Sequence, residues 1–82
     1  MTLFDLYNEL INAKVPSNMY SLDGGLPSER HCITKQNGSN NWEVYYSERG
    51  NKSSLKIFSS EDEACKYFYN WVIKVAKSMG LI

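Results

Sequence analysis

Apolar residues recur at spacings of three and four near the start of the chain. They are Leu3, Leu6, Tyr7, Leu10 and Ile11, and this spacing predicts one apolar side of an α-helix. Thr2 can cap that helix together with Asp5, as in a capping box. Because the residue before a proline is pushed out of the helical region, Val15-Pro16 predicts that the helix runs only to about Lys14.

A segment rich in turn-forming residues follows the first helix. It includes Asp23-Gly24-Gly25-Leu26-Pro27, and glycine and proline in such density favour turns over regular structure. We therefore expect a connecting loop. Its possible hydrophobic anchors are Met19, Tyr20 and Leu22.

Three later segments have the alternation and turn chemistry of a β-meander. They run from Glu29 to Gln36, from Trp42 to Ser47 and from Ser54 to Phe58, and alternating apolar and polar residues are typical of half-buried strands. The turns between them contain Asn37-Gly38 and Gly50-Asn51. Asn and Gly tolerate the positive φ of tight hairpins, so the three strands are predicted to pair in sequence order.

Strand parity predicts which side chains face the core, because successive residues point to opposite faces. The inward set is predicted to be Trp42, Val44, Tyr46, Leu55 and Ile57, and the outward set Glu43, Tyr45, Ser47 and Lys56. The sheet should then have one open, mostly polar face.

The clearest element boundary lies at the second helix. Ser60 can cap it, and Glu61, Asp62 and Glu63 meet the positive end of its dipole. Its apolar stripe comprises Ala64, Phe68, Trp71, Val72, Val75 and Met79, and Gly80 supplies a stop. The predicted fold is α+β, with an N-terminal helix, a three-stranded antiparallel β-meander and a C-terminal helix packed on one sheet face (αβββα). The chain, residues 1–82, should form a single domain.

Charge and hydropathy narrow the functional classes. Nine basic residues balance nine acidic ones, so nucleic-acid binding through an overall basic field is disfavoured. No apolar run approaches the roughly 20 residues that span a bilayer, and the N-terminus lacks the pattern of a signal peptide. We expect a cytoplasmic protein that does not enter membranes.

The residues that carry chemistry do not form a recognisable catalytic or metal-binding set. His31 is the only histidine, and we expect it to be a surface or half-buried structural residue rather than a catalytic one. Cys32 and Cys65 lack metal-ligand spacing and are expected to be buried free thiols, with a disulfide as the less favoured alternative. Glu43 and Glu48 fall on opposite strand faces, so they should not act as paired carboxylates. We therefore expect no enzymatic activity, no cofactor and no metal.

Aromatic content is the compositional feature most open to a functional interpretation. Aromatic residues make up 13% of the chain, and Tyr45, Tyr67 and Tyr69 fall off the predicted core stripes. Exposed tyrosines among acidic residues are typical of protein-binding surfaces.

Two stretches carry a family resemblance. Trp42-Glu43-Val44-Tyr45-Tyr46-Ser47-Glu48-Arg49-Gly50 and the segment from Phe58 to Phe68 resemble the central part of small immunity proteins from bacterial polymorphic toxin systems, which include contact-dependent inhibition. The resemblance implies a single-domain protein that neutralises a cognate toxin, such as a nuclease, by covering its active site or an essential surface.

On this hypothesis the partner is a toxin protein with a basic surface, and the chain is favoured to be a monomer. The predicted contact residues are Asp23, Glu29, Glu43, Tyr45, Glu48, Glu61 and Asp62. The alternative is a small adaptor or subunit of a larger cellular assembly, including one that contains RNA. Genomic position separates the two hypotheses. A gene directly downstream of a large secreted protein with a variable C-terminal domain favours immunity, and a gene among translation genes favours the adaptor.

Overall fold

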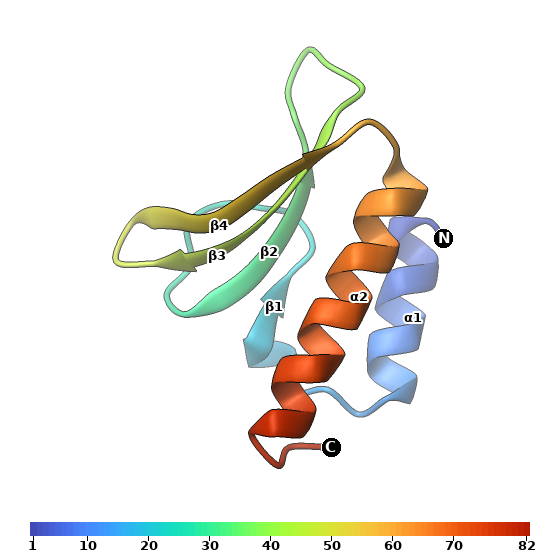
Figure 1. Cartoon of the computed structure of the whole chain (residues 1–82), viewed down its shortest axis with the longest axis vertical. Helices are drawn as coiled ribbons and strands as arrows, with labels where there is room; N and C mark the ends of the chain where they lie inside the picture. Colours follow the sequence, from blue (N-terminus) through green and yellow to red (C-terminus); the bar gives the residue numbers. More distant parts are fainter.

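Two helices lie on one side of a four-stranded sheet in the computed structural model, which describes residues 1–82 (Figure 1). The elements in order are α1 (Leu3–Asn12), the 3₁₀-helix η1 (Ser17–Met19), β1 (Tyr20–Ser21), β2 (Arg30–Lys35), β3 (Trp42–Glu48), β4 (Asn51–Phe58) and α2 (Glu61–Ser78). The predicted α+β class is confirmed. Helix α2 packs directly on the sheet, whereas α1 packs mainly on α2.

The sheet differs in detail from the predicted meander. Its strand order is β1-β2-β3-β4, and the three longer strands pair antiparallel in sequence order as predicted. The prediction of only three strands, all antiparallel, is wrong because β1 pairs parallel to β2, with Tyr20 opposite His31. A strand of two residues is too short to show any alternation of apolar and polar positions.

Helix α1 begins with the predicted capping box. The Asp5 backbone N–H donates to Thr2 Oγ1 over 3.2 Å, and the Thr2 N–H donates to Asp5 Oδ2 over 3.0 Å. The helix ends at Asn12, two residues before the predicted end, because Lys14 takes a φ of 61° that a right-handed helix cannot contain. Leu6 and Leu10 are fully buried and belong to the hydrophobic core.

Helix α2 supplies most of the core. Ala64, Phe68, Val72 and Ala76 repeat every four residues and are fully buried, and they pack with Ile33 and Val44 from the sheet and with the buried leucines of α1. Ser60 Oγ accepts a hydrogen bond from the Glu63 N–H over 3.1 Å, as its predicted capping role requires. Met79 lies just beyond the helix and is exposed, so its predicted place in the buried stripe is wrong.

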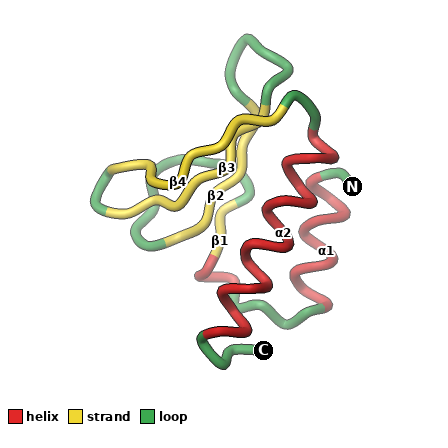
Figure 2. Tube along the Cα trace, in the orientation of Figure 1, coloured by secondary structure: helices red, strands yellow, loops and turns green.

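Residues 22–29 form a crossover loop that connects the parallel strands β1 and β2 across the sheet face opposite the helices (Figure 2). The Tyr45 hydroxyl donates a 2.6 Å hydrogen bond to the Gly25 carbonyl, and a Cβ on Gly24 would lie 2.9 Å from Thr34 Cβ. The loop therefore rests on β2 and β3. The predicted open outer face is wrong in this region, and Tyr45, predicted to be exposed, is almost fully buried.

The side chains of strand β4 also point to different faces of the sheet from those predicted. A β-bulge lies between Val44 and Tyr46 of β3, opposite Ser54, whose φ is 55°. Lys56 pairs with Val44 and Ile57 pairs with Glu43, and directly opposed residues point to the same face. Lys56 therefore lies on the helix side and Ile57 on the outer side with Leu55. The predicted inward placement of Leu55 and Ile57 is wrong.

Candidate partner-binding surfaces

Helix α1 has an apolar stripe that the core does not use. Phe4 is 74% exposed, and Tyr7 and Ile11 are each 48% exposed. Their positions differ by three and four residues, so their side chains share one face of the helix. Large exposed apolar groups on contiguous surface are typical of interaction sites. We call these three residues the α1 stripe.

A hollow of about 390 Å³ extends the α1 stripe toward the edge of the sheet. Its lining residues are Tyr7, Tyr20, Ser21, Leu22, Asp23 and Arg30. Asp23 accepts a 2.8 Å hydrogen bond from Ser21 Oγ, and the buried Tyr20 hydroxyl has no hydrogen-bond partner. The hollow and the stripe share Tyr7, so they form one continuous surface with an acid at its border.

Helix α1 as a whole is acidic. Helix α1 contains Asp5 and Glu9 and no basic residue, and both acids are exposed. Like charges repel when they are brought together in an interface, whereas opposite charges accelerate association. At 3.6 residues per turn, however, both acids lie on the side of α1 away from the stripe. The charged residues that adjoin the stripe are Asp23 and Arg30, which line the hollow.

The sequence does not predict this surface, because the predicted apolar side places Tyr7 and Ile11 together with Leu6 and Leu10 and omits Phe4. The structure divides that set, because Leu6 and Leu10 are buried whereas Tyr7 and Ile11 are exposed. A signal was available in the sequence. Six of the first nine residues of α1 are Leu, Phe, Tyr or Ile, which is more than a single buried stripe of a short helix can accommodate. The excess apolar positions are the ones that remain exposed.

A second surface lies on the outer face around Glu43, which was expected to be solvated but is buried. Glu43 accepts hydrogen bonds from Lys52 Nζ over 2.5 Å and from Gln36 Nε2 over 3.1 Å. Lys52 Nζ also lies 4.6 Å from the centroid of the Tyr45 ring. A polar hollow of about 670 Å³ opens beside this network. Lys52 and Glu43 thus form an ion pair across β3 and β4.

The environment of Glu43 favours its ionised form. Burial by itself raises the pKa of this carboxyl, but the hydrogen bonds from Lys52 and Gln36 outweigh burial and bring the pKa below its ordinary value of 4.5. Burial raises the pKa of the neighbouring Tyr45 to about 12. The network therefore holds a carboxylate, an ammonium and a neutral phenol at neutral pH.

Replacing Glu43 with glutamine should lower the free energy of unfolding at neutral pH by about 1.5–3 kcal/mol, the range for hydrogen bonds to charged groups. Because the folded-state pKa is depressed, the Glu43 carboxylate stabilises the fold above pH 4.5 and loses that effect as the pH falls through the folded-state pKa. The variant should therefore lose less stability on acidification than the parent protein. Urea unfolding at pH 7 and pH 3 measures both effects. Glu48→Gln, an exposed position on the same strand, is the control and should change little.

A third hollow, of about 660 Å³, lies between the end of α2 and strands β2 and β3. His31 is at its base, with ring centroids 4.4 Å from Trp71 and 4.9 Å from Tyr46. Burial lowers the pKa of His31, so the ring is neutral at neutral pH. His31 is thus more buried than the surface or half-buried position expected for it, and its ring packs as an aromatic.

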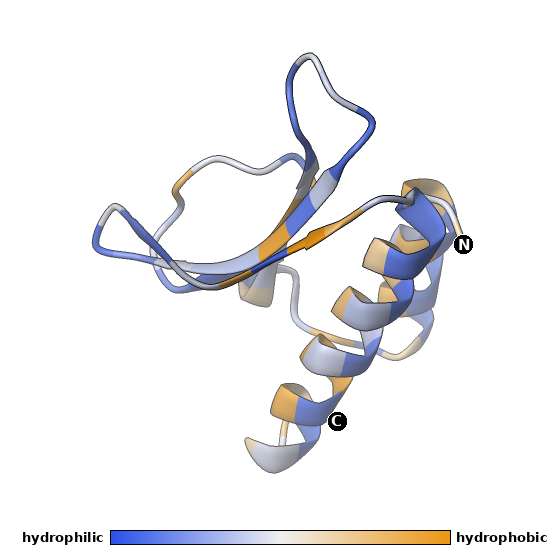
Figure 3. Ribbon diagram, turned by 45° about the horizontal axis from the view of Figure 1, so that its top comes forward, coloured by the Kyte–Doolittle hydropathy of each residue, from blue (hydrophilic) through white to orange (hydrophobic).

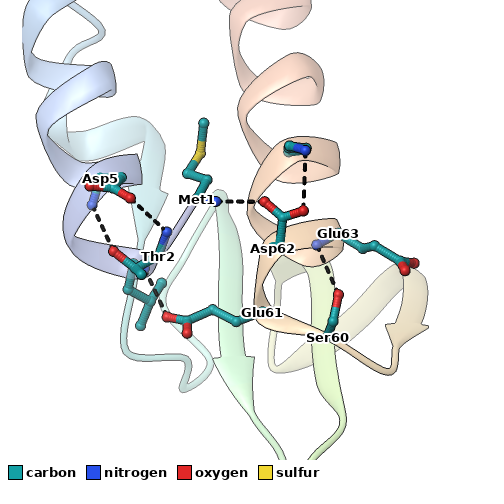
Figure 4. Close-up of polar contacts among 9 residues, drawn as sticks. Met1, Thr2, Asp5, Ser60, Glu61, Asp62 and Glu63 are labelled. Atoms are coloured by element: carbon teal, nitrogen blue, oxygen red, sulfur yellow. Dashed lines mark hydrogen bonds and ion pairs between the residues drawn. The ribbon is translucent and has the colours of Figure 1, made fainter.

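The acids at the tip of α2 hold the start of the chain (Figure 4). The Met1 amine lies 2.5 Å from Asp62, and the Leu3 N–H donates to Glu61 over 2.9 Å. The hydrogen bond between the Met1 amine and Asp62 raises the pKa of the amine and lowers that of the carboxyl. Asp62 also forms an ion pair with Lys66 at 3.1 Å. Glu61 and Asp62 therefore have intramolecular partners.

The seven predicted contact residues do not form one surface. Asp23, Glu43 and Tyr45 line the outer hollow, while Glu29 and Glu48 lie at the far end of the pair formed by β2 and β3. Helix α2 follows Phe58, which pairs with Trp42 at the other end of β3. Six residue steps along β3 correspond to about 20 Å, so Glu48 and the α2 tip are well separated.

Comparison with protein-family models, with curated proteins and with solved structures finds no match. No helix has the length and apolar character to cross a bilayer. No group of three or more metal-ligating side chains comes together. Cys32 and Cys65 are both buried and unpaired.

Proposed function

We propose that this protein is an immunity-type inhibitor that binds and neutralises a cognate bacterial toxin domain in the cytoplasm, with the α1 stripe as its principal contact surface. The exposure of Phe4, Tyr7 and Ile11 is the observation that carries the proposal. The resemblance of the segments from Trp42 to Gly50 and from Phe58 to Phe68 to immunity proteins supports the type of partner.

The α1 stripe has the chemistry of a binding hot spot. Aromatic side chains dominate interface energies because they bury a large area while few rotatable bonds become fixed. Phe4 is the most exposed of the large hydrophobic residues. A partner that covers Phe4 therefore removes from water an apolar surface that folding alone leaves exposed. The flanking contacts then need only exclude water and set the orientation.

The acidic character of helix α1 favours a basic target. Helix α1 carries Asp5 and Glu9 and no basic residue, and Asp23 lies together with Arg30 in the hollow that adjoins the stripe. A nuclease must present Lys or Arg to bind phosphates, and an acidic inhibitor can cover such a site. Neutralisation by this route requires no catalysis by the inhibitor. Association should then be fast at low salt and slower at high salt.

The proposal is tested with the product of the neighbouring gene. The protein is co-expressed with the C-terminal domain of an adjacent secreted protein, and growth and copurification are measured. Phe4→Glu combined with Ile11→Glu should weaken binding at least about 100-fold, as expected when two hot-spot residues are lost, and should abolish growth rescue. The melting temperature should change little, because both side chains are exposed.

A control variant carries the same added charge elsewhere. Asn40→Glu and Asn70→Glu lie at exposed positions outside the α1 stripe and should retain full rescue. If the Phe4 and Ile11 variant rescues growth as well as the parent, the α1 stripe is not the contact surface. If the parent neither copurifies with the adjacent toxin domain nor rescues growth, the immunity function is wrong.

A further inference from the structure

Strand β4 has one edge without a neighbour. It is the last strand of the sheet and pairs only with β3, so the backbone groups along its other edge have no partner within the sheet (Figure 2). Exposed edges of this kind can accept another strand, and proteins often block them with bulges and lysines. Strand β4 contains both a bulge and lysines, but neither blocks the free edge of its C-terminal half.

The bulge and the two lysines leave Leu55 to Phe58 accessible. The bulge lies before this segment, at Ser54. Lys52 is held by Glu43, and Lys56 turns onto the helix side, where its Nζ is 5.5 Å from the centroid of the Tyr67 ring. Lys56 forms no ion pair, so its ammonium is available to an incoming carboxylate.

The same segment exposes two large aliphatic side chains. Leu55 is 48% exposed and Ile57 is 47% exposed, and the hydropathy of β4 rises toward its C-terminal end (Figure 3). Both side chains lie on the outer face, with Lys56 between them on the other face. The segment therefore presents an alternating apolar, basic and apolar pattern along a free edge.

We propose that the β4 edge is a strand-addition site for an extended segment of a partner protein that carries an acidic residue between two apolar residues. In this arrangement the acid lies opposite Lys56, and the apolar residues lie opposite Leu55 and Ile57. Main-chain hydrogen bonds supply affinity, and the alternating side chains supply specificity. Directly opposed side chains interact in this way across neighbouring strands.

A second copy of the chain fits this edge less well. Antiparallel pairing of two β4 strands that sets Leu55 opposite Ile57 of the second copy also sets Lys56 opposite Lys56 of the second copy. Like charges directly opposed across strands are destabilising. An acidic segment replaces that repulsion with an attraction. The site is separate from the α1 stripe and does not depend on the proposed toxin inhibition.

A pair of synthetic peptides tests the proposal. The end-capped probes are Thr-Thr-Val-Glu-Val-Thr-Thr and the same peptide with Lys in place of Glu, titrated into isotope-labelled full-length protein and followed by NMR. The Glu peptide should shift the amide signals of β4 and slow their hydrogen exchange, whereas the Lys peptide should bind about threefold to tenfold more weakly, as a cross-strand charge pair predicts. Lys56→Glu should reverse this preference.

Lys74→Glu is the matched control, because it makes the same charge change at an exposed position on α2. It should leave the preference for the Glu peptide intact. Equal binding of the two peptides to the parent, or an equal effect of the two protein variants, would overturn the proposal. So would a concentration-dependent dimer that Ile57→Lys dissociates, because the occupant of the edge would then be a second copy.

Discussion

Replacing Phe68 with alanine should lower the free energy of unfolding by about 3–5 kcal/mol, the usual cost of truncating a buried phenylalanine. Phe68 is fully buried in the core cluster, where α2 meets both the sheet and α1. Domains of this size have only about 4–12 kcal/mol of total stability. A large fraction of the variant should therefore be unfolded at physiological temperature. Urea denaturation followed by circular dichroism measures the loss.

Phe4→Ala is the matched control for this experiment. It makes the same chemical change at a residue that is 74% exposed, and it should alter stability by no more than about 0.5 kcal/mol. Phe4→Ala should instead weaken partner binding. A stability loss at Phe4 comparable to that at Phe68 would show that Phe4 is packed in solution and would contradict the α1 stripe as a free surface.

Replacing Gly24 with alanine should lower the free energy of unfolding by about 2–5 kcal/mol. Its φ of 74° lies in the left-handed region, which costs an L-residue about 1–2 kcal/mol. In addition, the new Cβ would lie 2.9 Å from Thr34 Cβ, and relieving such overpacking typically costs about 1–3 kcal/mol. The crossover loop would have to lift from the sheet, which would also strain the hydrogen bond between Tyr45 and Gly25.

Gly38→Ala separates the two causes. Gly38 has a similar φ of 71° but no atom within 4 Å of the position that a Cβ would take. It should cost only about 1–2 kcal/mol, and the difference between the two variants measures the contact with Thr34. Equal losses of unfolding free energy in urea would show that the crossover loop does not press on the sheet.

Local elements could be predicted from the sequence because their determinants lie within a few residues of one another. The caps at Thr2 and Ser60 involve partners three residues away, and the hairpin turns contain their own Asn and Gly residues. The pairing of β1 with β2 depends instead on the path of the crossover loop. That path is set by contacts such as the one between Tyr45 and Gly25, which lie 20 residues apart. The spacing of apolar and polar residues in the sequence does not reveal such a contact.

The faces of β4 could not be predicted for a related reason. A bulge shifts strand parity by one residue, and Ser54 carries no sequence feature that marks it. Hydropathy alone placed Leu55 and Ile57 inside, although Lys56 can cover Tyr67 with its aliphatic stem while keeping its ammonium in water.

The predicted contact residues do not gather on one surface, because charge in the sequence does not reveal whether a side chain already has an intramolecular partner. Glu43 is engaged by Lys52, nine residues later, and Asp62 by the amine of Met1, 61 residues earlier. Asp23, Glu29 and Glu48 remain exposed. Exposure, which sequence cannot measure, is what separates these acids from Glu43.

The packing of α1 on α2 has a consequence for synthesis on the ribosome. Helix α1 ends at Asn12, and α2 does not begin until Glu61, so the intervening segment takes about 2–10 seconds to translate at typical rates. During that interval Leu6 and Leu10 have no helix to cover them. The buried face of α1 should therefore remain exposed on the nascent chain until α2 has left the ribosome.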